Sequence, residues 1–156
     1  MSAEMESLTV LNLNSCSNLR KLPEFKGIMK SISELHLLKT AIKDLPLTLI
    51  KCLPSLKYLT LSGGFNFVTL PASISQLSNL EALDFSNCVK LRSVPELPAS
   101  VRYIKAEGCT SLEPSPALYR QCSLSQPRSQ SYDESSGGLA FTILTSYLQV
   151  LSLSLC

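Results

Sequence analysis

The stretch Leu80-Glu-Ala-Leu-Asp-Phe-Ser-Asn-Cys-Val-Lys-Leu-Arg-Ser-Val-Pro95 is the clearest copy of a unit that recurs along the chain. Its apolar skeleton also begins at Leu8, Ile32 and Leu56, so four copies are evenly spaced by 24 residues. A shorter fifth copy begins at Val101. A regular period of this length is typical of a solenoid, in which each repeat packs against its neighbours.

Each repeat contains the motif LxxLxL, in which inward leucines alternate with outward variable residues, as in a half-buried strand. We therefore expect one strand per repeat. Strands that arrive by the same route stack in parallel, and their outward residues form one concave face. The expected outward residues are Val10, Asn12, Asn14, Glu34, His36, Leu38, Tyr58, Thr60, Ser62, Ala82, Asp84, Ser86, Tyr103, Lys105 and Glu107.

After each strand the chain must turn inward, and the position there holds Cys16, Thr40, Gly64, Cys88 or Cys109. A small side chain fits such a turn, and Thr or Cys can also donate to a buried carbonyl. Glycine offers only space, so we expect the third turn to be looser. Beyond the Leu-Pro pairs, apolar spacing predicts short helical turns at 47–53 and 72–77, whereas the prolines at 95–98 predict an extended link.

Composition limits the class of protein. With 156 residues and 45% apolar residues, the chain has about the size and core of one domain. A net charge of +2, with both signs interspersed, does not indicate a nucleic-acid-binding protein.

The six cysteines include no CxxC pair, which favours a structural role over a zinc or disulfide site. The sequence shows neither a signal peptide nor a glycosylation sequon, so we expect a reducing, cytoplasmic location.

Four segments follow from these patterns: an N-terminal stub at 1–7, repeats at 8–113, a Pro/Ser/Gly-rich linker at 114–138 and an apolar tail at 139–156. The tail is uncharged over 18 residues, near the lower limit for a membrane span. Three interpretations stay open for it: a membrane anchor, a packed helix or strand, or translated sequence outside any folded element. Its interior Ser, Thr and Gln residues and its lack of flanking basic residues weaken the anchor hypothesis.

The pattern LxxLxLxxCxxLxxLP resembles the leucine-rich repeats of plant intracellular immune receptors that combine a Toll/interleukin-receptor-like domain, a nucleotide-binding domain and repeats. Residues 37–46 are similar to that family's shortened T-A-I-x-x-L-P unit, and residues 94–113 to its terminal repeat. The resemblance covers about Met5 to Glu113. It implies an α/β solenoid, a leucine-rich repeat horseshoe segment of about five repeats with a short parallel sheet on its concave face.

The same resemblance implies a function in plant defence, disease resistance, innate immunity and signal transduction. The phosphate-binding pattern GxxxxGK[ST] is absent, so the family's nucleotide switch cannot operate within this sequence. The chain therefore resembles a fragment or truncated relative. Its partner would be a pathogen effector, a host protein or adjoining receptor domains. The alternatives are a non-functional repeat fragment and a membrane-attached adaptor held by the tail.

No common catalytic motif occurs, and the sequence contains one histidine, His36. His36 should project from the concave face beside Glu34, where a surface histidine on a binding face is a better interpretation than a catalytic dyad. We therefore expect neither enzyme activity nor a cofactor or metal. Aromatic rings make good interface anchors, and we predict a protein-binding site formed by Asn12, Glu34, His36, Tyr58, Thr60, Asp84, Tyr103 and Lys105.

Overall fold

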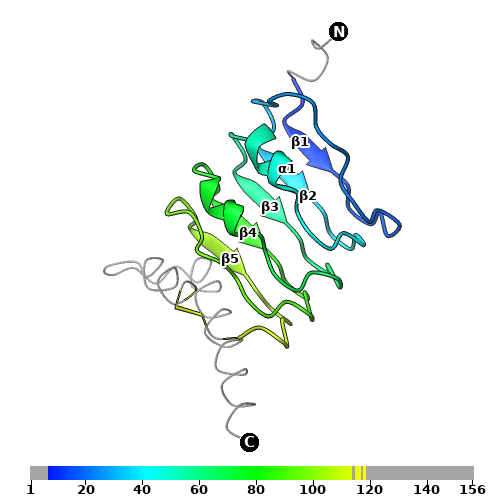
Figure 1. Ribbon diagram of the computed structural model, residues 1–156, viewed down its shortest axis with the longest axis vertical. Coiled ribbons are helices and arrows are strands. Elements are labelled where there is room, and N and C mark those ends of the chain that lie inside the picture. The colour runs from blue at the N-terminus through cyan, green and yellow to red at the C-terminus, as the bar shows by residue number, and fades with distance from the viewer. Residues whose placement is uncertain (1–6, 114, 117, 119–156) are drawn as a thin grey trace, which may run out of the picture.

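The computed structural model describes residues 7–113, 115, 116 and 118. Each sequence repeat contributes one three-residue strand to a sheet with the order β1-β2-β3-β4-β5 (Figure 1). All neighbouring strands are parallel. The strands are β1 (Val10–Asn12), β2 (Glu34–His36), β3 (Tyr58–Thr60), β4 (Ala82–Asp84) and β5 (Tyr103–Lys105).

The strand register follows the repeat spacing. Paired residues are 24 positions apart from β1 to β4, as in Val10 with Glu34, and 21 positions apart between β4 and β5, where Ala82 pairs with Tyr103. The middle residue of each strand points into the stack. Leu35, Leu59, Leu83 and Ile104 are buried there, whereas Leu11 in the first repeat is only partly buried.

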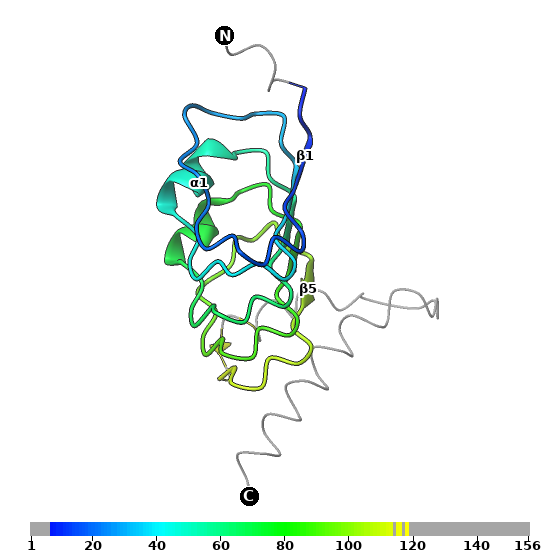
Figure 2. The ribbon, with the colours of Figure 1, turned by 90° about the vertical axis from the view of Figure 1, so that its right-hand side faces the viewer.

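Short helices lie on the side of the stack opposite the sheet (Figure 2). The segments at 47–53 and 72–77 are helical as predicted: α1 (Leu47–Cys52) is an α-helix and η1 (Ala72–Gln76) is a 3-10 helix. Each begins after a proline in extended conformation, Pro46 or Pro71. Between β4 and β5 the segment 95–98 contains no helix, in agreement with the prediction that a link without a helical turn stands there.

The third residue after each strand has a left-handed backbone, with φ between 55° and 69°. These residues are Ser15, Lys39, Gly63, Asn87 and Gly108. The N–H of each of the first four donates to a carbonyl of the following repeat at 2.6–2.9 Å, which extends the ladder beyond the strands. The repeat pattern did not predict this turn, because Ser15 and Lys39 share the position with Gly63, Asn87 and Gly108, and only glycine and asparagine ordinarily favour a left-handed backbone.

The inward turn position behaves as predicted in three repeats. Thr40 Oγ1 donates to the Leu37 carbonyl at 3.1 Å, Cys88 Sγ to Leu61 at 3.3 Å and Cys109 Sγ to Phe85 at 3.1 Å. These side chains are buried, and each satisfies a carbonyl in the turn of its own or the preceding repeat.

Two expectations about this position are wrong. Cys16 is exposed, because it belongs to the first repeat and no described repeat packs over it. The turn at Gly64 is not looser, because the fully buried Phe67 ring fills the space that a side chain would occupy. A Cβ at Gly64 would lie 2.5 Å from Phe67 Cδ2 and 2.9 Å from the Leu61 carbonyl oxygen.

The core reaches beyond the last predicted repeat residue. Leu118 is 3% exposed and joins the same apolar cluster, although the sequence analysis placed it in the linker. Residues 1–6, most of the linker at 114–138 and the whole tail at 139–156 lie outside the described residues. Within the described part of the chain, no helix has the length and apolar character that crossing a membrane requires.

Candidate functional site

The first and third residues of every strand share the face of the sheet that points away from the core, and we call this surface the open face. Pairing between strands arranges them in two rows. The first row is Val10, Glu34, Tyr58, Ala82 and Tyr103, and the second is Asn12, His36, Thr60, Asp84 and Lys105. All eight residues of the predicted binding site lie in these rows.

A hollow of about 380 Å³ lies on the open face across β2 to β5. Every predicted site residue except Asn12 lines it. Ala82 also lines the hollow, together with Leu59 and Leu83, which are buried residues in the middle of their strands. Because a hollow collects groups from four strands, it can contact one ligand with several side chains at once.

Ala82 leaves a gap between two aromatic side chains. In the first row it stands between Tyr58 and Tyr103, which are 42% and 53% exposed. Neighbouring strands are about 4.8 Å apart, so the two tyrosines begin about 10 Å apart, with only a methyl group between them. We call Tyr58, Ala82 and Tyr103 the tyrosine slot.

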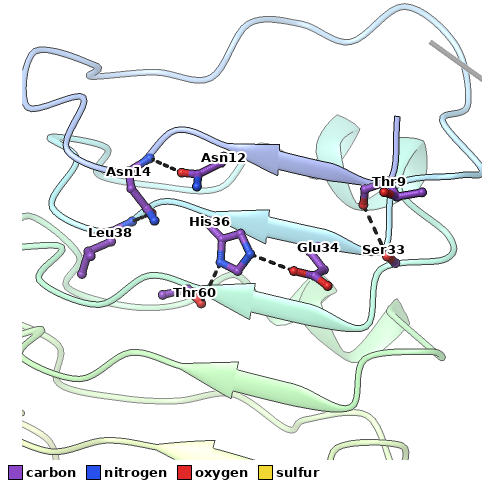
Figure 3. Close-up of polar contacts among 8 residues, drawn as sticks. All are labelled: Thr9, Asn12, Asn14, Ser33, Glu34, His36, Leu38 and Thr60. Atoms are coloured by element: carbon purple, nitrogen blue, oxygen red, sulfur yellow. Dashed lines mark hydrogen bonds and ion pairs between the residues drawn. The ribbon is translucent and has the colours of Figure 1, made fainter. Parts of the chain in front are cut away.

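A hydrogen-bonded chain of three side chains lies beside the slot (Figure 3). His36 Nε2 is 3.0 Å from Glu34 Oε2, and His36 Nδ1 is 3.4 Å from Thr60 Oγ1. The sequence analysis placed His36 beside Glu34 but missed Thr60 as its second partner. The repeat spacing could have predicted this contact, because His36 and Thr60 are 24 residues apart and pair across β2 and β3.

The order carboxylate, imidazole, hydroxyl also occurs in hydrolase triads. Here two backbone N–H groups near Thr60 are used between strands: the N–H of Leu61 donates to the Asp84 carbonyl and the N–H of Tyr58 to the Ser33 carbonyl. Oxyanion stabilisation needs N–H groups that point at the substrate. The arrangement therefore fixes the imidazole ring and leaves these N–H groups engaged elsewhere.

Charged groups of both signs reach the hollow. Asp84 pairs with Lys105 across β4 and β5, but no ion pair among the described residues joins them. Asp84 Oδ1 accepts a hydrogen bond from the Ser86 N–H at 2.9 Å. Because a carboxylate offers about four acceptor sites, Asp84 retains capacity for a ligand.

Some predicted outward positions do not belong to the open face. Ser62 and Ser86 are buried, and Ser62 Oγ donates to the Ser86 carbonyl at 3.0 Å. They lie just before the left-handed turn, where the chain bends toward the core. Asn12 does belong to the open face but lies outside the hollow, and its Oδ1 accepts a hydrogen bond from the Asn14 N–H at 3.0 Å (Figure 3).

Two of the buried thiols, Cys88 and Cys109, are unsuited to nucleophilic chemistry. Burial raises the pKa of Cys88 to about 12 and the pKa of Cys109 to about 11. The thiolate is the reactive form of cysteine, so both groups stay protonated near neutral pH. Their hydrogen bonds to carbonyls are consistent with the structural role that the sequence predicts.

Known proteins similar to this chain have names that refer to resistance. The chain is 43% identical over 112 residues to disease resistance protein RPS4B of Arabidopsis thaliana, which covers 71% of this chain and 9% of that protein. It is 40% identical over 92 residues to TMV resistance protein N of Nicotiana glutinosa, covering 59% of this chain and 8% of that protein. It is 33% identical over 131 residues to probable disease resistance protein RPP1 of Arabidopsis thaliana, covering 72% and 11%.

The chain therefore spans about a tenth of the length of these relatives. No protein-family model matches it.

Proposed function

Because the chain belongs with the plant disease resistance proteins, we propose that its open face is a protein-recognition surface that serves plant immunity. The observation that carries this proposal is the hollow of about 380 Å³, which gathers the predicted face residues from four strands. Its two exposed tyrosines provide large contact area with a hydroxyl at the end, a combination enriched at protein interfaces.

We further propose that the repeats form a segment of a leucine-rich repeat solenoid. Three features support this: one strand per repeat, a sheet whose order follows the chain, and a register set by the 24-residue period. Such a surface is extended and shallow, which suits a protein partner better than a small molecule. The partner would be a pathogen effector, a host protein or adjoining receptor domains, met in the cytoplasm.

Recognition is also a better proposal than catalysis for the Glu34, His36 and Thr60 chain. The imidazole is held from both ring nitrogens, so its orientation is fixed. A side chain fixed in this way loses little entropy when a partner binds, which favours affinity. The proposal therefore assigns these residues to positioning within a binding face.

Site-specific photocrosslinking tests the recognition function. The full chain, expressed in plant cells, would carry p-benzoylphenylalanine at Tyr58 or Tyr103, with Lys51 as the control position. Lys51 is an exposed residue of α1, on the side opposite the sheet. We expect a discrete protein adduct from the two open-face positions and none from Lys51. Equal adducts from all three positions, or none from the open face, would contradict the proposal.

A further inference from the structure

We propose that the tyrosine slot binds an arginine side chain of the protein partner. This inference rests on the proposed recognition function and adds the chemistry of the group recognised. The slot joins two exposed aromatic rings with a small residue, Ala82, between them, and the Asp84 carboxylate lies two positions along β4 from Ala82.

The shape of the slot suits one flat group. Tyr58 and Tyr103 begin about 10 Å apart, two strand spacings, with Ala82 at the base. After the thickness of the two rings is subtracted, the space between them is wider than a planar guanidinium group is thick. Arginine stacks on aromatic faces both as a plane and as a cation, whereas a lysine ammonium offers only a point charge.

The charge of the slot suits a cation. Asp84 follows Ala82 by two positions on β4, so both residues are on the open face and both line the hollow. One Asp84 oxygen accepts from the Ser86 N–H, and the carboxylate keeps acceptor sites for a guanidinium fork. The other carboxylate of the hollow, Glu34, is on β2, on the far side of Tyr58 from Ala82 and outside the slot, where it contacts His36. The arginine is therefore expected at Asp84.

Lys105 faces the same hollow and opposes a cation. Its side chain is exposed, so the ammonium can extend into water, where repulsion is screened. Substitutions of Asp84 and Lys105 should therefore have opposite effects on arginine binding. Loss of the Asp84 charge should weaken arginine binding, and loss of the Lys105 charge should strengthen it.

Titration followed by NMR tests the inference directly. The probe is N-acetyl-arginine N-methylamide, added to the full chain with labelled tyrosine rings. The matched control is the citrulline compound, which has nearly the same shape and no charge. We expect saturable shifts at the Tyr58 and Tyr103 rings with an affinity on the order of millimolar, as for other small fragments. The citrulline compound should give no saturable shift at the same concentrations.

Three variants locate the site. Ala82→Leu fills the slot without removing a charge or a ring, and should abolish saturation. Asp84→Asn keeps an acceptor for the Ser86 N–H and should weaken binding about tenfold, since an ion pair becomes a hydrogen bond between the guanidinium and a neutral amide. Lys105→Gln should tighten binding about twofold. Backbone amide spectra of all three should match that of the unmodified chain.

Several results would overturn the inference: no saturable shift, equal shifts with citrulline, binding unaffected by Ala82→Leu, or saturation by N-acetyl-glutamate N-methylamide instead. These outcomes are distinct from failure of the recognition function. Crosslinks at Tyr58 without arginine binding would leave recognition standing and remove arginine as its target. Arginine binding without crosslinks would support the slot and remove the proposed protein partner.

Discussion

Gly64 and Phe67 form a coupled pair, and exchanging both should cost less than the sum of the two single exchanges. The other repeats place Thr or Cys where Gly64 stands, and Leu or Ile where Phe67 stands, as in Cys88 and Leu91. In Gly64→Cys, the new Cβ would lie 2.5 Å from Phe67 Cδ2, closer than real side chains approach. Phe67→Leu removes that obstruction and leaves a space that a cysteine can fill.

The structure sets the size of each term. Gly64→Cys overpacks a turn whose neighbour is fully buried, which costs about 1–3 kcal/mol. Phe67→Leu leaves a partly filled cavity and costs about 1–2 kcal/mol. The Leu61 carbonyl lies 2.9 Å from the Cβ position, but the same turn tolerates a side chain at Cys88, whose N–H donates to Phe85 just as Gly64 donates to Leu61. The double variant should therefore recover at least about 1 kcal/mol relative to the sum.

Urea unfolding, followed by circular dichroism, measures all four free energies of the cycle. Ser75→Ala, an exposed site on η1, is the control that should add independently to either single change. If the two single costs add in the double variant, the Phe67 ring does not occupy the Gly64 side-chain space. The account of this turn would then be refuted.

Two further predictions follow from the backbone and from the thiols. Lys39→Gly should raise the free energy of unfolding by about 0.5–1 kcal/mol, because Lys39 has a φ of 55°, which glycine adopts without strain. The control Lys43→Gly, at a residue outside the left-handed region, should lower the free energy of unfolding. Urea titrations measure both changes. Burial raises the pKa of Cys88 from 9.0 to about 12, so its contribution to stability is complete below pH 9 and is lost as pH rises toward 12. Between pH 8 and 11 the unmodified chain should therefore lose roughly 3 kcal/mol of its free energy of unfolding. Thermal melts of Cys88→Ser should show a flatter dependence of stability on pH, whereas the control Cys16→Ser, at an exposed position, should behave like the unmodified chain.

The positions and pairing of the strands could be predicted from the sequence, because an apolar period reports directly which residues face the core. Leu35, Leu59 and Leu83 are spaced by one repeat, and they pair as the period requires. The details of the turns could not be predicted in this way. In the sequence pattern, glycine at position 64 supplies no side chain, and only the packing shows that the Phe67 ring fills the space that a side chain would occupy.

The candidate site was predictable as a set of residues but not as a geometry. Alternation along each strand identifies Tyr58, Asp84 and Tyr103 as outward residues. It does not show that Ala82 opens a hollow between them, since a gap is a property of neighbours across strands. It also placed Ser62 outward, where the bend after the strand buries it.

The short fifth repeat has a direct bearing on this geometry. The step from β4 to β5 is 21 residues instead of 24, yet Ala82 still pairs with Tyr103. The shortening is absorbed between the strands, where the segment 95–98 contains no helix, whereas each of the two preceding connections contains one. The open face is therefore insulated from changes in length behind it. What shapes the slot is the size of the residue at position 82, because any long side chain there would close the gap that both tyrosines leave open.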